Sequence, residues 1–382
     1  MDEVICVVYL DYSATTPVID EVLDSFNTVT KEFFGNANSL HSLGLKSREL
    51  LFSARKQICD ILKIKDDEVI LTSGATEANN RALIGVCLSR KKFGNHIIVS
   101  KLEHPSIYEI CKYLEGNGFK VSYVNVDKEG VVDLEHLKTL VNDKTILVSI
   151  CGVNSETGVR QPLRTIKQVV KHENRDCYIH SDLTQGLGKI KLNLDDVDLA
   201  SFSAHKIYAP KGIGMLYKKD GVNISPIMFG SETGKEIGTP PLPLIVAFSK
   251  AIRLMYANFK EKEETVSLCA KKLLDGLKRY EGIKINRSKY TIDNIINISL
   301  MDIKPETFIH AMEKHDIYIS SNTACSSGKL STSVMAIYND INRASTTIRI
   351  SISYLTTEKE IDLFLSVFGE EYNKLINLVK GE

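Results

Sequence analysis

Two residues that could hold an aldehyde cofactor lie at the ends of successive apolar segments. Lys206 is the last residue of the segment 201–206, and Asp182 comes shortly after the predicted strand 177–180. A lysine amine forms a Schiff base with the aldehyde of pyridoxal 5'-phosphate (PLP), and a carboxylate keeps the pyridine nitrogen of that ring protonated. A helix cap is the ordinary alternative for an aspartate in this position. We predict a PLP site with Lys206 as its covalent anchor and Asp182 at the ring nitrogen.

A polar segment at residues 72–77 has the composition of a phosphate-binding turn. It follows an apolar run and opens a stretch with helical periodicity. Backbone N–H groups and the positive end of the helix dipole bind phosphate at such a start. We expect Ala75 and Thr76 to hold the cofactor phosphate, with Ser203 and His205 donating to the same group. An ordinary N-cap is the alternative, and the nearby lysine makes phosphate binding the better interpretation.

Three further side chains could orient the cofactor or the substrate. His104 follows a predicted strand, where its ring could stack on PLP and move protons, although a solvated loop histidine is commoner. Gln185 could bond the phenolic oxygen of the ring. Arg349 lies in a strand pattern, and its planar guanidinium suits an amino-acid carboxylate, whereas the alternative is a solvent-facing arginine.

One cysteine lies where cysteines are seldom found. Cys325 belongs to residues 320–331, a small and polar segment, whereas the other seven cysteines mostly lie in apolar or helical contexts. An accessible thiol whose thiolate is stabilised is a nucleophile. We therefore predict Cys325 as a nucleophile.

The overall composition is that of a soluble enzyme. The chain has 382 residues, of which 43% are hydrophobic and 25% charged, and 48 basic residues balance 48 acidic ones. This balance argues against bulk attraction to nucleic acid or to an acidic membrane, and no apolar run approaches the roughly 20 residues of a membrane helix. The apolar residues 4–10 indicate a strand, not a signal peptide. Eight scattered cysteines without a CxxC pair predict no metal site and a cytoplasmic location.

Strand and helix patterns alternate through most of the first two-thirds of the chain, which predicts an α/β fold with a mainly parallel sheet. Ligands bind at the carboxyl ends of such strands, where the polar motifs fall. From residues 238–243 onward the pattern changes to a long helical stretch over 244–280, strands near 294–300 and 347–353, and a final helix from 358. This change indicates a second, α+β domain. The candidate strands of the sheet are 68–72, 96–100, 121–124, 145–150, 177–180, 199–202 and 214–217.

Taken together, the motifs resemble the cysteine desulfurases of the NifS/IscS-like kind, in the class V aminotransferase group of fold-type I PLP enzymes. The resemblance runs nearly end to end. It is carried by residues 9–17, 34–36, 73–77, 103–104, 182–185 and 203–206 and by the Cys325 segment.

The resemblance implies a homodimer with a large PLP domain over 15–252, containing a seven-stranded sheet, and a small domain from 1–14 and 253–382. It implies that Asn36 and Arg349 bind the substrate carboxylate and that Thr239 reaches the phosphate of the neighbouring subunit. The chain departs from the family pattern at four positions. Ser155, expected to contact the cofactor, replaces a longer asparagine, Ala204 replaces glycine, Glu236 replaces arginine, and Ala37 replaces a common proline.

The implied reaction converts L-cysteine to L-alanine and leaves the sulfur as a persulfide on Cys325. Lys206 would move the α-proton, and His104 would manage the thiol protons. The sulfur would then pass to an acceptor protein, such as an iron–sulfur scaffold or a component of tRNA thiolation. The alternatives are a selenocysteine lyase, a class V aminotransferase and a degenerate, non-catalytic sulfur-pathway binding protein.

Overall fold

A seven-stranded sheet forms the centre of the larger part of the molecule. The computed structural model describes residues 7–230, 238–321 and 330–381. The strand order is β2-β8-β7-β6-β5-β3-β4, and β8 is antiparallel to both of its neighbours, whereas the other pairs are parallel. This confirms the predicted mainly parallel sheet. The strands are β2 (Val69–Thr72), β3 (His96–Ser100), β4 (Lys120–Val124), β5 (Thr145–Ser149), β6 (Tyr178–Asp182), β7 (Leu199–Ser203) and β8 (Gly214–Lys218).

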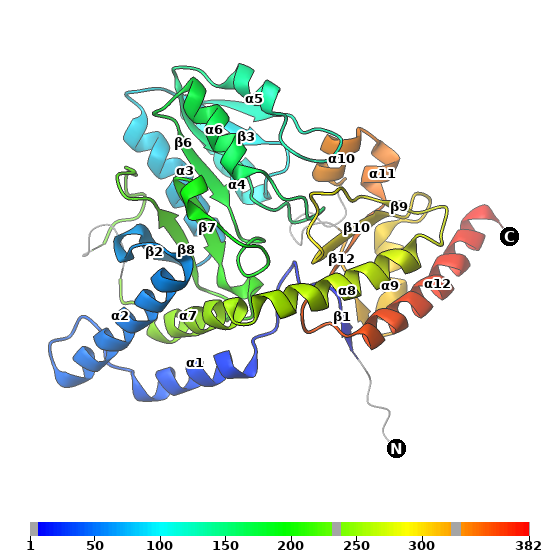
Figure 1. The fold of residues 1–382 in the computed structure, drawn as a ribbon, viewed down its shortest axis with the longest axis horizontal. Helices are drawn as coiled ribbons and strands as arrows, with labels where there is room; N and C mark the ends of the chain where they lie inside the picture. Colours follow the sequence, from blue (N-terminus) through cyan, green and yellow to red (C-terminus); the bar gives the residue numbers. More distant parts are fainter. Residues whose placement is uncertain (1–6, 231–237, 322–329, 382) are drawn as a thin grey trace.

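Helices cover both faces of this sheet (Figure 1). Central strands such as β5 and β7 are buried along their whole length, as expected for strands covered on both sides. Ile97, Ile146 and Leu199 pack with α3 and α4 on one face, whereas Ile98 and Val148 pack with α2, α6 and α7 on the other. The helices of this part are α1 (Asp20–Glu32), α2 (Ser42–Leu62), α3 (Ala75–Arg90), α4 (Pro105–Gly116), α5 (Leu134–Leu140), α6 (Leu163–Glu173) and α7 (Leu242–Tyr256), with short 3-10 turns at Asp66–Glu68, Leu194–Asp196 and Ala204–Lys206.

A second, smaller assembly has its own hydrophobic core. Its three-stranded sheet has the order β12-β10-β9, and beside it β1 pairs with β11 in parallel. Val8 and Leu10 from the start of the chain pack in this core with residues of the C-terminal helix. The elements are β1 (Val8–Tyr9), α8 (Phe259–Leu277), β9 (Lys284–Ile285), β10 (Ile295–Ser299), α9 (Pro305–Glu313), β11 (Ile317–Tyr318), α10 (Thr332–Tyr338), α11 (Ile341–Ser345), β12 (Thr347–Ser351) and α12 (Glu358–Lys380).

Two sequence-based expectations differ from the structure. The helical stretch predicted over 244–280 is two helices, α7 and α8, which meet at an angle of 72°. Ala257 is extended and Asn258 has a left-handed φ of 53°, so the backbone turns between them. Asparagine tolerates this conformation better than most residues. The strand expected over 4–10 is described only from residue 7 onward, where it comprises Val8–Tyr9.

Within the described ranges, no single helix has both the length and the apolar composition to cross a membrane, and α7 with α8 would meet both only as a bent pair.

Polar segments follow the strands along one edge of the large sheet. Because β2, β3, β5, β6 and β7 run in the same direction, their carboxyl ends lie together at this edge. Asp182 ends β6 and Ser203 ends β7, and His104 and Ser155 lie in the loops after β3 and β5. The alternation of strands and helices therefore delivers residues from five segments to one place.

Candidate active site

A cavity of about 480 Å³ lies at the carboxyl edge of the sheet. The N-terminal segment contributes Ser13 and Ala14 to its wall, and the small assembly contributes Arg349. Ten of the thirteen residues predicted for the site line it: Ala75, Thr76, His104, Ser155, Asp182, Gln185, Ser203, His205, Lys206 and Arg349. The fold thus brings together side chains that are up to 274 positions apart, from Ala75 to Arg349.

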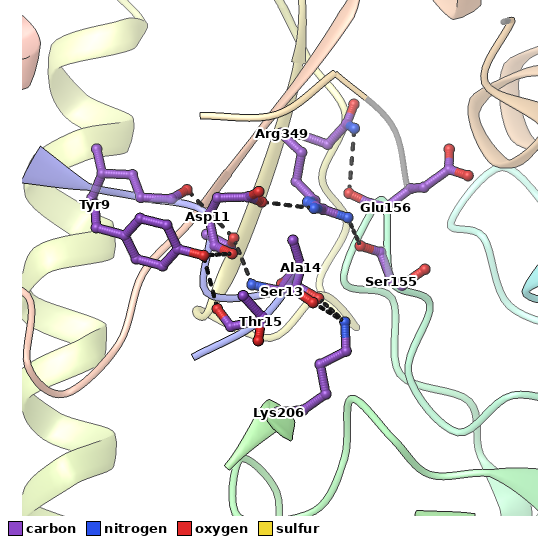
Figure 2. Close-up of polar contacts among 12 residues, drawn as sticks. Tyr9, Asp11, Ser13, Ala14, Thr15, Ser155, Glu156, Lys206 and Arg349 are labelled. Carbon is purple, nitrogen blue, oxygen red and sulfur yellow. Dashed lines mark hydrogen bonds and ion pairs between the residues drawn. The ribbon is translucent and has the colours of Figure 1, made fainter. Parts of the chain in front are cut away.

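Lys206 extends into the cavity from the short turn after β7. Its Nζ donates to the carbonyl oxygens of Ser13, at 2.5 Å, and Ala14, at 2.6 Å (Figure 2). Tyr9 fixes the segment that carries these carbonyls, because its hydroxyl donates to the carbonyls of Asp11 and Thr15. Backbone carbonyls of the N-terminal segment therefore hold the amine. Ala204, the first residue of this turn, is buried in the core.

Asp182 is connected to His104 through two polar side chains. Asn79 on α3 donates from Nδ2 to Asp182 Oδ2 at 2.9 Å and to Ser106 Oγ at 3.1 Å. The Ser106 hydroxyl lies 2.9 Å from His104 Nδ1, and the Ser106 backbone N–H donates to the same nitrogen. Since Asn79 uses Ser106 Oγ as an acceptor, the hydroxyl proton of Ser106 is available to His104.

This arrangement determines the tautomer of His104. Nδ1 accepts hydrogen bonds as the N-cap of α4, so the neutral ring carries its proton on Nε2. Burial lowers the pKa of His104, the charge of Asp182 opposes that shift, and Lys206 adds to it. A neutral imidazole that lines the cavity can donate from Nε2 there, while Nδ1 stays bound to the helix.

The first turn of α3 presents backbone N–H groups to the cavity. Its N-cap is Gly74, which makes no side-chain cap, and Ala75 and Thr76 line the wall. Gly74 lies against the start of β8, where a Cβ on Gly214 would be 2.6 Å from the Gly74 Cα. Position 214 therefore requires glycine to let the turn approach the sheet. The absence of a capping side chain favours an anion at this helix start over the ordinary N-cap.

Two side chains beside this turn have the chemistry of phosphate ligands. Ser203 is buried at the end of β7, and its Oγ would be 3.8 Å from a Cβ on Gly74. Burial lowers the pKa of His205 to about 4, with smaller effects from Lys206 and Lys211, so its ring is neutral near pH 7. Lys211 also lines the cavity, and the sequence analysis did not select it.

Arg349 is almost completely enclosed, with 1% of its surface exposed. Its Nη2 donates to Asp11 Oδ1 at 2.8 Å, and its Nη1 donates to the Ser155 carbonyl at 3.0 Å (Figure 2). Within the described part of the chain, its Nε is buried without a hydrogen-bond partner. The solvent-facing alternative for Arg349 is therefore wrong, and a buried donor remains for a ligand carboxylate.

Three predicted residues are not among those that line the cavity. Asn36 lies in the loop between α1 and α2, where it is exposed and its Oδ1 accepts from the Asn38 backbone N–H. Thr239 is exposed in the loop between β8 and α7. Cys325 lies outside the described residues, as does Glu236. The roles of Asn36, Thr239 and Cys325 remain predictions.

Sequence reasoning missed several residues that hold the predicted ones. Asn79 is fully buried on the face of α3 that also carries Ala78 and Ala82, and a polar residue on such an apolar face was a usable signal. Asp11 and Ser13 gave no such signal, because their partners are 338 and 193 positions away.

The donor set of the cavity fits PLP. An amine, a carboxylate and an uncapped helix start with neighbouring hydroxyl and imidazole groups match its aldehyde, ring nitrogen and phosphate. Ser13 Oγ and Thr184 Oγ1 also line this cavity, and among the described residues neither has a hydrogen-bond partner. These atoms are available to a polar ligand.

The chain resembles one family throughout most of its length. The model of the family described as aminotransferase class-V matches residues 8–364. A protein of Clostridium botulinum (strain Kyoto / Type A2) named "Cysteine desulfurase IscS" is 37% identical over 370 residues, which cover 94% of this chain and 93% of that protein.

Two solved structures have closely similar folds. One, described as a "NIFS-LIKE PROTEIN", has a TM-score of 0.91 and 35% identity, covering 96% of this chain and 99% of its own. The other, described as "SspA in complex with cysteine", has a TM-score of 0.80 and 28% identity, covering 92% of this chain and 100% of its own.

Proposed function

The chain belongs to the aminotransferase class-V family, and from this membership and the cavity described above we propose that it is a PLP-dependent cysteine desulfurase. The observation that carries the proposal is the meeting of Lys206, Asp182 and Arg349 in one cavity of a chain 37% identical to a protein named cysteine desulfurase. The reaction converts L-cysteine to L-alanine and transfers the sulfur to a thiol of the enzyme.

The described residues divide the work of holding the cofactor. Lys206 would bond its aldehyde carbon, Asp182 would pair with its ring nitrogen, and Gln185 would donate to its phenolic oxygen; all three line the cavity. The first turn of α3, with Ala75 and Thr76, would hold the phosphate together with Ser203 and His205, and Ser155 would contribute a polar contact. When bound, PLP supplies an electron sink for bond breaking next to the amino group of the substrate.

Arg349 and Lys206, which both line the cavity, would orient the amino acid. Arg349 binds its carboxylate, with Asn36 as the proposed second ligand, and this places the α-carbon near Lys206. The Lys206 amine takes the α-proton when it is not bonded to the cofactor. His104, with its proton on Nε2, would manage the protons of the reacting thiols.

The transfer of sulfur to the enzyme needs no external oxidant. The thiolate of Cys325 attacks the sulfur of the substrate, an S–S bond forms, and the C–S bond breaks. The carbon keeps the electron pair of the broken bond and takes up a proton, which gives alanine. The enzyme is left with a persulfide, from which an acceptor protein for iron–sulfur cluster assembly or tRNA thiolation takes the sulfur.

Incubation of the purified protein with L-cysteine and dithiothreitol, with assays of alanine and sulfide, tests this function. Cys325→Ala should keep the absorbance of bound PLP and lose sulfide release, whereas Lys206→Ala should lose the covalently bound cofactor. Cys269→Ala, which alters a buried cysteine in the core of the smaller assembly, serves as the matched control. Full turnover by Cys325→Ala would contradict the assignment of the nucleophile.

The same assay separates the proposal from the other activities. An aminotransferase would convert an added keto acid without needing Cys325, and a selenocysteine lyase would strongly prefer selenocysteine to cysteine. Equal activity of Cys325→Ala with selenocysteine would favour the lyase. A purified protein that binds no PLP would favour a non-catalytic binding protein.

The proposed enzyme works as a homodimer in the cytoplasm. Asn36 and Thr239, which do not line the cavity within the described chain, lie in loops that also carry exposed Phe34 and Phe229. A second copy packed on these loops would bring Thr239 to the phosphate site of its neighbour. The six cysteines that the structure describes are buried as free thiols, which suits a reducing compartment.

A further inference from the structure

A second lysine contacts the cofactor cavity indirectly, through Gln185. Lys189 lies four positions after Gln185, and its Nζ donates to Gln185 Oε1 at 2.5 Å. The other end of that amide, Nε2, donates to the Ser13 carbonyl at 2.9 Å. Gln185 itself is 4% exposed and lines the cavity, whereas Lys189 lines a second cavity of about 230 Å³.

These two contacts leave the Gln185 amide only one orientation. A lysine head group offers donors, so the amide atom beside it must be the oxygen. A backbone carbonyl only accepts, so the amide atom beside Ser13 must be the nitrogen. The NH₂ group therefore lies on the cavity side of Gln185, next to the carbonyl that also accepts from Lys206.

Without Lys189, one of these two constraints is lost. The Ser13 carbonyl would still attract the NH₂ group, but the buried Oε1 would have no donor and the amide could rotate. A buried carbonyl without a donor is unfavourable, which favours another rotamer of the amide.

The position of Lys189 is electrostatically unfavourable for a lysine that only fills space. Burial, with smaller contributions from the charges of Lys206 and Arg349, lowers the pKa of its amine to about 7. An apolar side chain of the same length would avoid both costs. A lysine in this place indicates that its donor is used, and Gln185 is the partner that the structure shows.

We propose that Lys189 is a positioning residue, which orients the Gln185 amide so that its NH₂ group donates to the phenolic oxygen of PLP. The proposal rests on the proposed function, because Gln185 has this partner only in the cofactor-bound enzyme. It assigns Lys189 a role in cofactor binding through Gln185, without contact to the substrate.

A double-mutant cycle tests this role. The variants are Lys189→Met, Gln185→Leu and their combination, and Lys191→Met, which changes an exposed lysine two positions later, is the matched control. Each protein is stripped of cofactor and titrated with PLP to obtain its Kd and the position of the absorbance band. Urea unfolding of each cofactor-free protein measures any purely structural effect.

Lys189→Met should weaken PLP binding about tenfold and shift the absorbance band, because loss of an oriented donor to a charged oxygen costs about 1.5 kcal/mol. In the Gln185→Leu background, Lys189→Met should change the Kd less than about twofold, because the residue through which it acts is gone. Lys191→Met should leave both the Kd and the band unchanged.

Two outcomes would overturn the inference alone. The first is a Lys189→Met protein that is less stable but has the Kd and band of the parent. The second is an undiminished effect of Lys189→Met in the Gln185→Leu background. A parent protein that binds PLP and makes alanine keeps the proposed function in either case, whereas a parent that binds no PLP overturns both.

Discussion

At the scale of single residues, Arg349 combines a buried position with a nearly saturated set of partners. Asp11 neutralises its charge, and the Ser155 carbonyl accepts from a second nitrogen. Breaking such a buried pair by removal of one partner costs about 3–5 kcal/mol, so truncation of Arg349 would confuse folding with binding. A charge-conserving substitution separates these two effects.

Arg349→Lys should raise the KM for L-cysteine about tenfold or more, while kcat changes less. The lysine ammonium keeps the charge beside Asp11 but replaces a planar fork by a single point donor, which loses about 1.5 kcal/mol of carboxylate binding. Steady-state kinetics measure the effect, and Arg279→Lys, at an exposed arginine after α8, is the control. An unchanged KM would exclude Arg349 as the carboxylate ligand.

Glu103, next to His104, is a buried acid with one oxygen in use. Its Oε1 accepts from the Ser100 hydroxyl and from the Cys151 backbone N–H, whereas its Oε2 has no partner within the described residues. The pKa of Glu103 is raised to about 8, chiefly by burial; the charge of Asp182 adds to this shift and the hydrogen bonds from Ser100 and Cys151 oppose it. The carboxyl group is therefore protonated in the native enzyme at neutral pH.

This protonation should make folding stability fall as the pH rises from about 5 to 8. In that window Glu103 keeps its proton in the native protein but loses it in the unfolded chain, where its pKa is near 4.3. The free energy of unfolding therefore falls by up to about 1.4 kcal/mol per pH unit. Urea unfolding at pH 5.5 and pH 8 should show a smaller loss for Glu103→Gln than for the parent. The exposed Glu115→Gln should lose as much as the parent, and equal slopes in all three proteins would refute the assignment.

At the scale of elements, α10 begins at a residue with two partners. Ser331 is its N-cap and accepts from the Val334 backbone N–H at 3.1 Å. The same hydroxyl donates at 2.5 Å to Glu156 Oε2, which is buried. Burial raises the pKa of Glu156, and the bond from Ser331 opposes this shift. One hydroxyl thus connects the start of α10 to the loop after β5, which also carries Ser155.

Ser331→Ala should destabilise the protein by about 2–4 kcal/mol. About 1 kcal/mol comes from the lost cap, and the remainder comes from a buried acceptor on Glu156 that loses its donor. Ser345→Ala, at an exposed serine on α11, should cost much less. Urea denaturation compares the two, and equal losses would show that the Glu156 contact contributes nothing.

The elements that the sequence predicted well are those with local signals. The apolar run over residues 145–150, for example, corresponds to β5. Asp182 and Lys206 were found because they are polar residues at the ends of such runs. The break at Asn258 was missed because both flanking segments have helical periodicity, and only the backbone turn separates them. Contacts such as that of Asn79 with Asp182, 103 positions apart, depend on the whole fold and have no local signal.

At the scale of the whole molecule, the loop before α2 and the loop after β8 expose large apolar side chains. Phe34 is 73% exposed, Leu40 is 86% exposed and Phe229 is 83% exposed. The loops with these residues also carry Asn36 and Thr239, the two proposed ligands that do not line the cavity in the described chain. Contact with a second copy would bury this apolar surface and bring both ligands to a neighbouring site.

Light scattering after size-exclusion chromatography should give twice the mass of one chain. The double variant Leu40→Glu with Phe229→Glu should shift the protein towards the monomer and weaken PLP binding, because charges resist burial and Thr239 leaves its neighbour. Leu378→Glu, at an exposed position near the end of α12, should remain a dimer. A monomeric parent with full activity would refute the proposed assembly.

The pairing of residues 8–13 with residues near the other end of the sequence has a consequence for biosynthesis. Val8 pairs with Ile317, the Ser13 N–H donates to Ser351 Oγ, and Asp11 neutralises Arg349. At about 5–20 residues per second, the ribosome needs about 20–70 s to reach position 349 after position 11. This segment therefore remains without its partners until residues 317–351 have been synthesised, and messenger truncations that end before codon 349 should yield products unable to retain vitamin B6.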